Sequence, residues 1–175
     1  MITIRPVSEA DWPAIAAIYA HHVQHGTGTF ETEPPSEVEM RNRGQDVLAK
    51  GLPYLIVCDA QTVMGFAYAN WFKPRPAYRF SAEDSIYLHP DAAGRGLGRL
   101  LLSELLRQLE TRGVRQVLAV IGDSNNQGSI GVHRSLGFAH QGVMRHCGWK
   151  FGQWLDVVLM QKAIGAGATS APEEN

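Results

Sequence analysis

The chain reads Ile86-Tyr87-Leu88-His89-Pro90-Asp91-Ala92-Ala93-Gly94-Arg95-Gly96-Leu97-Gly98 at the point where a β-rich segment gives way to a helix. Pro90 ends the expected strand, and leucines at helical spacing follow the glycines. The first N–H groups of a helix have no intrahelical partner, and the helix dipole adds partial positive charge there. This stretch therefore predicts a site for an anion, such as a phosphate or a diphosphate, between a strand and a helix.

The spacing of Gly94, Gly96 and Gly98 narrows the choice of anion. A dinucleotide-binding fingerprint has its third glycine one position later, where Arg99 stands. A P-loop ends in Gly-Lys followed by Ser or Thr, a triplet that this sequence lacks. Both nucleotide motifs are therefore disfavoured. The alternatives are a different phosphate ligand, or a glycine turn that only lets the strand and the helix pack closely.

The composition predicts one globular domain. The chain has 175 residues, of which 45% are hydrophobic, and this is enough for a substantial core. We expect this domain to span residues 1–163. A flexible tail is expected over residues 164–175, where small, polar and acidic residues predominate.

Charge and apolar segments argue against nucleic-acid and membrane partners. The net charge is −1 with acids and bases interspersed, and no apolar run approaches the roughly 20 residues that span a bilayer. The N-terminus shows no signal peptide pattern. Cys58 and Cys147 lie in strand-like segments, so we expect buried free thiols in a cytoplasmic protein, with a disulfide as the alternative.

Hydrophobic periodicity, capping residues and turn residues predict the order of helices and strands. Ser8 and Asp11 have the spacing of a capping box, and Ser36 caps a later helix. Phe151 and Gly152 are expected in the turn of a closing hairpin. Strands are expected over residues 2–5, 53–58, 63–72, 80–89, 116–121, 139–149 and 155–160, and helices over 12–25, 36–50, 97–112 and 126–136.

Four further segments carry a resemblance to a known family. Residues 126–138 read N-x-x-S-x-x-x-H-x-x-x-G-F, residues 79–85 read R-F-x-x-E-x-S, residues 148–156 read G-x-K-F-G-x-W-x-D, and residues 29–35 read T-F-E-T-E-P-P. The chain resembles the GNAT superfamily of N-acetyltransferases, and within it the phosphinothricin and methionine sulfoximine N-acetyltransferases. The glycine turn resembles their acyl-CoA loop, [QR]-x-x-G-x-[GA], with a departure at Ala93 in the first position.

The order of elements is also that of this family. The resemblance implies an α+β fold with a mixed, mostly antiparallel sheet flanked by helices, the GNAT acyl-CoA N-acyltransferase fold. It places a cofactor cleft between the strand before the glycine turn and the strand that follows the next helix. It further implies transfer of the acetyl group of acetyl-CoA to the α-amino group of a small amino acid analogue of the phosphinothricin, methionine sulfoximine or methionine sulfone type. The amine would attack directly in a ternary complex.

The resemblance assigns residues to the cosubstrate. Backbone N–H groups of the glycine turn would hold the diphosphate of acetyl-CoA, and the Leu88 N–H would polarise the thioester carbonyl. The cofactor-binding residues it implies are Ile86, Tyr87, Leu88, Gly94, Arg95, Gly96, Leu97, Gly98, Arg99, Asn126 and Ser135.

Glu83 and His133 are the expected catalytic residues. Glu83 would accept the proton of the amine, through a water molecule, and its alternative is an exposed carboxylate at a strand end. His133 would serve as the acid for the departing thiolate or as the base for the amine, and its alternative is a histidine that only packs on a helix. The expected substrate-binding residues are Phe30, Lys73, Arg75, Tyr78 and Arg79. The alternative for Lys73, Arg75, Tyr78 and Arg79 is a solvated loop with incidental charge. The alternative for Phe30 is a role in the core.

Other features complete the expectations. His21 and His25 share a helix face but lack further ligands, so no metal is expected. Trp149, Phe151 and Trp154 are expected in the core or, from the resemblance, in a homodimer interface. Acetylation of a peptide, polyamine or aminoglycoside, a CoA-binding sensor domain without turnover, and a nucleotide-binding module remain as alternative functions.

Overall fold

The computed structural model describes residues 1–173. The strands are β1 (Ile2–Pro6), β2 (Tyr54–Asp59), β3 (Thr62–Trp71), β4 (Ser81–Leu88), β5 (Gln116–Gly122), β6 (Ala139–Lys150) and β7 (Gln153–Ala163). The α-helices are α1 (Trp12–His25), α2 (Glu37–Ala49), α3 (Leu97–Glu110) and α4 (Gln127–Ser135), and short 3₁₀ turns η1 (Glu9–Asp11), η2 (Pro76–Tyr78) and η3 (Pro90–Ala92) lie between them.

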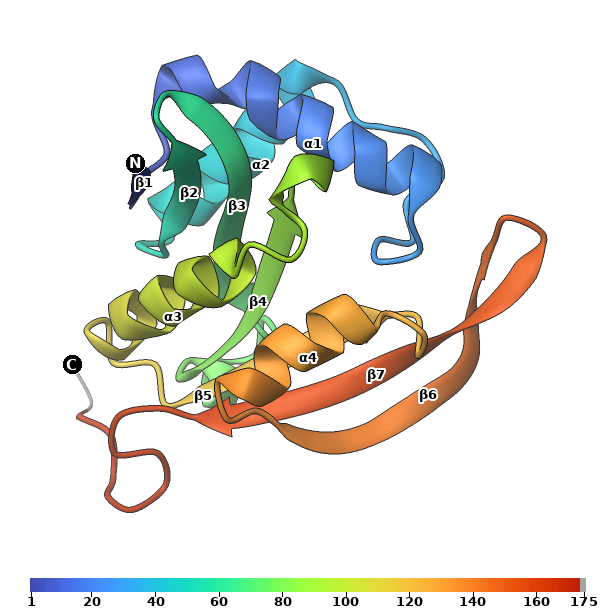
Figure 1. Ribbon diagram of the computed structural model, residues 1–175. Helices are drawn as coiled ribbons and strands as arrows, with labels where there is room; N and C mark the ends of the chain where they lie inside the picture. The colour runs from blue at the N-terminus through green and yellow to red at the C-terminus, as the bar shows by residue number, and fades with distance from the viewer. Residues whose placement is uncertain (174–175) are drawn as a thin grey trace.

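The strands form one seven-stranded sheet in the order β1-β2-β3-β4-β5-β7-β6. Every neighbouring pair is antiparallel except β4 and β5, which are parallel. This confirms the expected mixed, mostly antiparallel α+β architecture (Figure 1).

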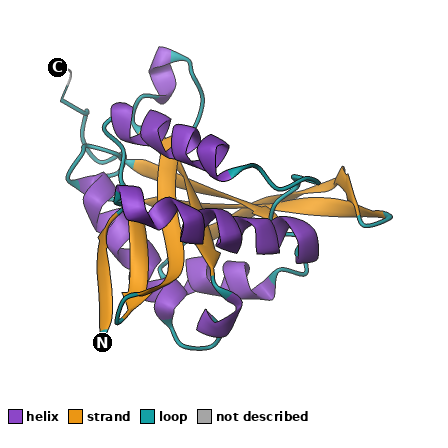
Figure 2. Ribbon diagram, turned by 90° about the horizontal axis from the view of Figure 1, so that it is seen from above, coloured by secondary structure: helices purple, strands orange, loops and turns teal. Residues whose placement is uncertain are grey.

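Helices cover both faces of the sheet (Figure 2). Successive side chains of a strand point to opposite faces. Tyr87 of β4 contacts Tyr19 of α1, whereas its neighbours Ile86 and Leu88 approach Gly98 of α3. Helix α1 therefore lies on one face of β4 and helix α3 on the other. The leucine stripe of α3 is buried, which explains why this helix forms against the sheet.

Helix α1 begins at Trp12 as expected, directly after the 3₁₀ turn η1 that the Ser8–Asp11 box caps. Two local expectations need correction. Cys147 is exposed rather than buried, while Cys58 is buried as expected, and both thiols are free. Ile164 is 5% exposed and belongs to the core, so it is not part of a loose tail. Residues 174–175 of the expected tail lie outside the described residues.

Candidate active site

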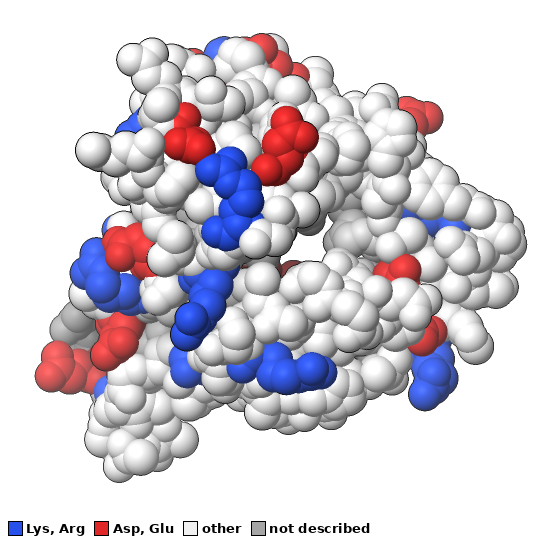
Figure 3. All heavy atoms as spheres, in the orientation of Figure 1, with Lys and Arg blue, Asp and Glu red and all other residues white. Residues whose placement is uncertain are grey.

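A cleft opens where β4 and β5 diverge. The two strands pair only over Ser81–Asp84 and Gln116–Ala119, although both continue beyond this point. Helices α3 and α4 and the residues after α1 close the sides of the resulting cleft of about 680 Å³. Figure 3 shows the hollow on one face of the molecule, between the part formed by α1 and the part formed by α4. A cleft is thus present at the position predicted for the cofactor, between β4 and β5.

The open edge of β4 offers unpaired backbone groups to the cleft. Ser81 and His89 bond to β3, as the bonds Phe72 N–H to Ser81 O and His89 N–H to Met64 O show. Because bonding direction alternates along a strand, Ile86 and Leu88 present their backbone groups to the opposite side. That side is the divergent gap, so the Leu88 N–H is available to a ligand.

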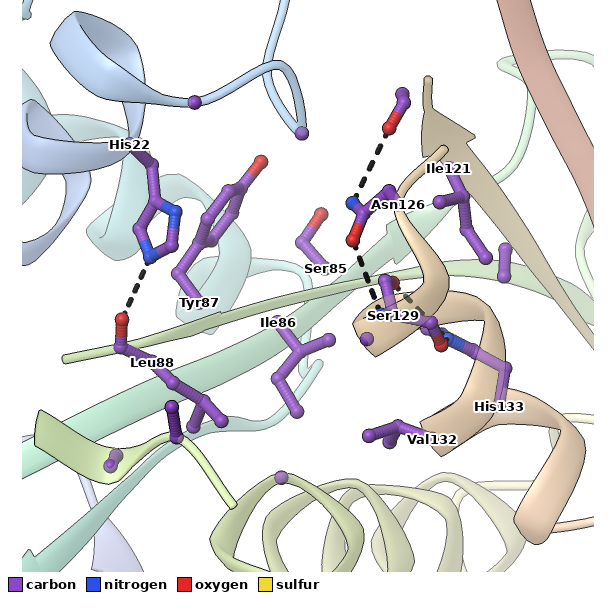
Figure 4. A pocket seen from close by; sticks show the side chains of 18 of the residues that line it. His22, Ser85, Ile86, Tyr87, Leu88, Ile121, Asn126, Ser129, Val132 and His133 are labelled. Carbon is purple, nitrogen blue, oxygen red and sulfur yellow. Dashed lines mark hydrogen bonds between the residues drawn. The ribbon is translucent and has the colours of Figure 1, made fainter. Parts of the chain in front are cut away.

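His22 was not predicted and lies at the end of this edge. Its Nε2 is 2.7 Å from the Leu88 carbonyl oxygen (Figure 4). A carbonyl oxygen only accepts, so Nε2 carries a hydrogen and donates it. Burial lowers the pKa of His22, against the raising effect of this bond, which favours the neutral ring. His22 therefore fixes the last peptide of β4 without adding a charge.

The glycine turn presents the start of α3 to the same cleft. Gly94 and Gly96 have φ angles of 72° and 73°, a left-handed conformation that favours glycine. Gly94, Gly96, Leu97, Gly98 and Arg99 all line the cleft. Within the described chain, no backbone acceptor pairs with the N–H groups of residues 97–99, as expected for the first turn of a helix. These donors fit an anion.

Arg95 departs from the prediction. Its N–H donates to the Ala92 carbonyl oxygen at 3.4 Å, and its guanidinium pairs with Asp59 at 2.5 Å. It does not line the cleft. Tight turns commonly use one N–H internally, and here that N–H belongs to Arg95. The Arg95 N–H is therefore already paired within the turn, and the role of Arg95 in binding the cosubstrate stays a prediction.

Helix α4 supplies the wall opposite α3. Asn126 caps it, accepting from the Ser129 N–H at 3.2 Å and donating to the Gly122 carbonyl oxygen at 3.3 Å, and it lines the cleft as expected. Ser135, at the other end of the helix, is exposed and donates to the Val132 carbonyl oxygen. Ser135 does not line the cleft, and its role in binding the cosubstrate stays a prediction.

Glu83 is half-buried on β4, on the same face as Ser85 and Tyr87. Burial raises its pKa first, the negative charge of Asp84 raises it further, and Lys73 opposes both. A carboxylate with a raised pKa is a better base near neutral pH. Glu83 has the raised pKa expected of a proton acceptor, but it is not among the residues that line the cleft, so its role as the base stays a prediction.

His133 points from α4 toward β4 and is 2% exposed. Its Nδ1 lies 2.7 Å from the Ser129 carbonyl oxygen, and its Nε2 lies 2.8 Å from Asp84 Oδ2. Burial alone would lower the pKa of His133, but the hydrogen bond and charge of Asp84 and the Ser129 carbonyl outweigh it and raise the pKa. Sequence reasoning missed Asp84, which is buried and also lines the cleft.

Known proteins similar to this chain identify its family. The model of the acetyltransferase (GNAT) family matches residues 15–138. The phosphinothricin N-acetyltransferase of Alcaligenes faecalis is 50% identical over 171 residues, which cover 98% of this chain and 87% of that protein. The chain belongs to the acetyltransferase (GNAT) family. The expected acyltransferase class and GNAT fold are confirmed.

Two further GNAT proteins extend the comparison. The L-methionine sulfoximine/L-methionine sulfone acetyltransferase of Pseudomonas paraeruginosa is 39% identical, covering 91% of this chain and 92% of that protein. A phosphinothricin acetyltransferase from Sinorhizobium meliloti, solved in complex with AcCoA, superposes with a TM-score of 0.95 at 44% identity, covering 99% and 94% of the two chains. These relatives are those of the expected branch of the GNAT superfamily.

The loop between α1 and α2 packs onto the strands of this GNAT fold. A Cβ atom added at Gly148 would lie 2.4 Å from the Phe30 ring, so only glycine admits the ring there. Lys150 is 3% exposed and donates to the carbonyl oxygens of Gly26 and Thr29 at 2.8 and 2.9 Å. Strand β6 therefore holds Phe30 and its loop beside the cleft.

The remaining predicted substrate residues lie outside the main cleft. Lys73, Arg75, Tyr78 and Arg79 are exposed on the segment between β3 and β4. Lys73 acts on the pKa of Glu83, which links this segment electrostatically to the base. Within the described residues, neither these four side chains nor Phe30 lines the cleft. Their role in binding an amino acid stays a prediction.

The hairpin of β6 and β7 projects from the body of the molecule (Figures 1 and 2). Trp149, Phe151 and Trp154 are 57%, 55% and 61% exposed, so the core alternative for them is wrong.

In residues 1–173, no group of three or more His, Cys, Asp or Glu side chains is arranged to hold a metal ion. Every described helix is too short or too polar to cross a bilayer.

Proposed function

We propose that this chain transfers the acetyl group of acetyl-CoA to the α-amino group of a small amino acid analogue of the phosphinothricin, methionine sulfoximine or methionine sulfone type. The amine attacks directly in a ternary complex. One observation carries the proposal. The open edge of β4 and the free N–H groups of α3 line a single cleft, and Glu83 lies on the same strand.

The cleft matches the chemistry of acetyl-CoA. The N–H groups of Gly96, Leu97, Gly98 and Arg99 hold the diphosphate, where each charge-assisted hydrogen bond contributes roughly 1.5–3 kcal/mol. Ile86 and Leu88 pair with the amides of the pantetheine arm, as an added strand would. The Leu88 N–H then faces the thioester carbonyl. The bound cosubstrate supplies an activated acetyl group.

Glu83 is the base in this proposal. An ammonium ion has no lone pair, so the amine must lose a proton before it attacks. Glu83 takes that proton through a water molecule. His133 is unsuited to the same task, because Nδ1 donates to the Ser129 carbonyl and Nε2 faces Asp84. His133 acts instead through its positive charge, which stabilises the departing thiolate.

The amino acid is held from the side of the β3–β4 segment. Lys73, Arg75, Tyr78 and Arg79 offer cations and donors for its carboxylate and its polar side chain. Phe30 offers an apolar wall. The cationic character of this segment disfavours polyamines and aminoglycosides, which carry positive charge themselves.

Two further parts of the proposal concern the whole protein. We propose a homodimer through the β6–β7 hairpin, supported by the exposed Trp149, Phe151 and Trp154. A cytoplasmic location is proposed as well, supported by the free thiols of Cys58 and Cys147.

An assay of thiol release tests the function. Acetyl-CoA is supplied with methionine sulfoximine, phosphinothricin, methionine sulfone, ordinary amino acids, a peptide, a polyamine and an aminoglycoside, and the products are identified by mass spectrometry. We expect N-acetylation of the amino acid analogues and little reaction of the cationic amines. Tight binding of acetyl-CoA without turnover on any amine would instead favour a sensor domain.

A further inference from the structure

A buried acid–histidine pair spans the floor of the cleft. The side chains of Asp84 and His133 are 1% and 2% exposed, and they meet at 2.8 Å across a sequence separation of 49 residues. Asp84 Oδ1 is buried and has no hydrogen-bond partner in the described structure. Buried polar atoms of this kind are rare and often belong to functional sites.

The acceptor chemistry fixes part of the proton inventory. The Ser129 carbonyl oxygen only accepts, so Nδ1 of His133 carries a hydrogen. One more proton is then shared between Nε2 and Asp84 Oδ2, which gives either an imidazolium–carboxylate pair or a neutral pair. The carboxylate and the second hydrogen bond both favour the imidazolium form, against the effect of burial.

The charges around the ring are few. Strand β4 contributes Asp84, and α4 itself contributes the Ser129 carbonyl. Phe138, which precedes β6, packs edge-on against the ring at 4.9 Å and adds no charge. Glu83 interacts with Asp84 but points to the other face of β4. Asp84 is therefore the acidic group that determines the state of His133.

We propose that Asp84 is a positioning residue for acetyl transfer, holding His133 with both ring nitrogens protonated against the cleft. This inference rests on the proposed function. In the reaction the ammonium group first gives one proton to Glu83, which releases it to solvent. The amine nitrogen then bonds to the acetyl carbon, the carbon–sulfur bond breaks, and its electron pair stays on sulfur. The nitrogen gives its second proton to Glu83 as the amide forms. The imidazolium stabilises the thiolate, which takes its proton from solvent on release.

The first test needs no variant. Nitrogen NMR of the wild-type protein labelled in histidine reports how many ring nitrogens of His133 carry hydrogen. We expect both to be protonated, and to remain so at a pH where free imidazole in solution has become neutral. A neutral His133 ring at that pH would overturn the proposal.

The second test uses Asp84→Asn. An amide donates to Nε2 instead of accepting from it, so His133 becomes neutral. We expect kcat to fall roughly ten- to a hundred-fold, in line with the loss of an outer-shell partner, while the Kd of acetyl-CoA changes less than about threefold. The alkaline limb of the kcat profile moves to lower pH. An unmoved limb would contradict the proposal.

Two controls separate positioning from folding. Asp46→Asn makes the same chemical change on exposed α2 and leaves the pH limb in place. In a His133→Gln background, Asp84→Asn should lower kcat little further, because Asp84 acts through His133. Full additivity would refute that coupling. If the wild type acetylates no amine, the proposed function fails, whereas the NMR result still decides the state of the pair.

Discussion

Glu83 is the proposed base, and the proposed mechanism depends on it. Replacing it with Gln keeps the shape of the side chain but removes the proton acceptor. We expect kcat to fall roughly 10²–10⁴-fold, the usual contribution of a general base, with the Kd of acetyl-CoA unchanged. Steady-state kinetics and calorimetry measure the two quantities. Equal turnover by both proteins would remove Glu83 from the mechanism.

The raised pKa of Glu83 also has a consequence for stability. A carboxyl group whose pKa is higher in the folded state disfavours folding once it ionises, so this contribution to stability declines as pH rises from the unfolded pKa through the folded pKa. Glu83→Gln removes the effect. At pH 7 we expect the variant to unfold at a higher urea concentration than the wild type. At acidic pH, where Glu83 is protonated in both states, we expect the two proteins to unfold at the same urea concentration. A less stable variant at pH 7 would contradict the assigned burial effect.

At the scale of elements, the divergence of β4 from β5 produces the site. A fully paired strand has no free N–H groups for a ligand, whereas β4 leaves β5 after Asp84 and keeps its edge open at Ile86 and Leu88. The glycine turn then places the start of α3 beside that edge. Binding thus depends on backbone geometry more than on side chains, which is why two conformationally demanding glycines stand in the turn.

The Gly96→Ala variant tests whether the glycine turn binds acetyl-CoA. Gly96 has φ of 73° and open space around its Cβ position, so alanine adds strain of about 1–2 kcal/mol without a clash. Relaxation of the turn misaligns the donors, and we expect acetyl-CoA to bind about tenfold more weakly or worse. Gly113→Ala is the matched control, with φ of 79° and equally open space after α3. Equal affinity of both variants would show that the turn does not bind the cosubstrate.

At the scale of the whole molecule, the β6–β7 hairpin predicts the assembly. Trp154→Glu places a charge at the tip of an apolar surface, so we expect the dimer to dissociate. Light scattering coupled to size exclusion gives the mass of each variant. Val38→Glu, on the exposed side of α2, is the control and should leave the mass unchanged. A wild-type monomer would contradict the proposed dimer.

Much of the fold followed from local patterns. The period of the leucines in α3, the cap at Ser36 and the turn at Phe151-Gly152 all depend on neighbours in sequence, and each is found as expected. Short-range motifs also indicated the cleft and the anion site. Surface exposure was harder to predict, because strand-like segments such as that of Cys147 give no sign of projecting beyond the core.

The missed residues share a different cause. Asp84 meets His133 across 49 residues, and His22 meets Leu88 across 66, so no local pattern connects either pair. Arg95 and Ser135 lie outside the cleft for a related reason. The Arg95 N–H bonds within its own turn and its guanidinium pairs with Asp59, while Ser135 bonds within its own helix. Motifs locate a site, whereas the tertiary structure decides which members face it.

A crystal structure with acetyl-CoA tests the central claim most directly. We predict the diphosphate against the N–H groups of residues 96–99 and the thioester carbonyl within hydrogen-bond distance of the Leu88 N–H, on the strand that carries Glu83. Coenzyme bound elsewhere, or a cleft left empty at saturating concentration, would contradict the account.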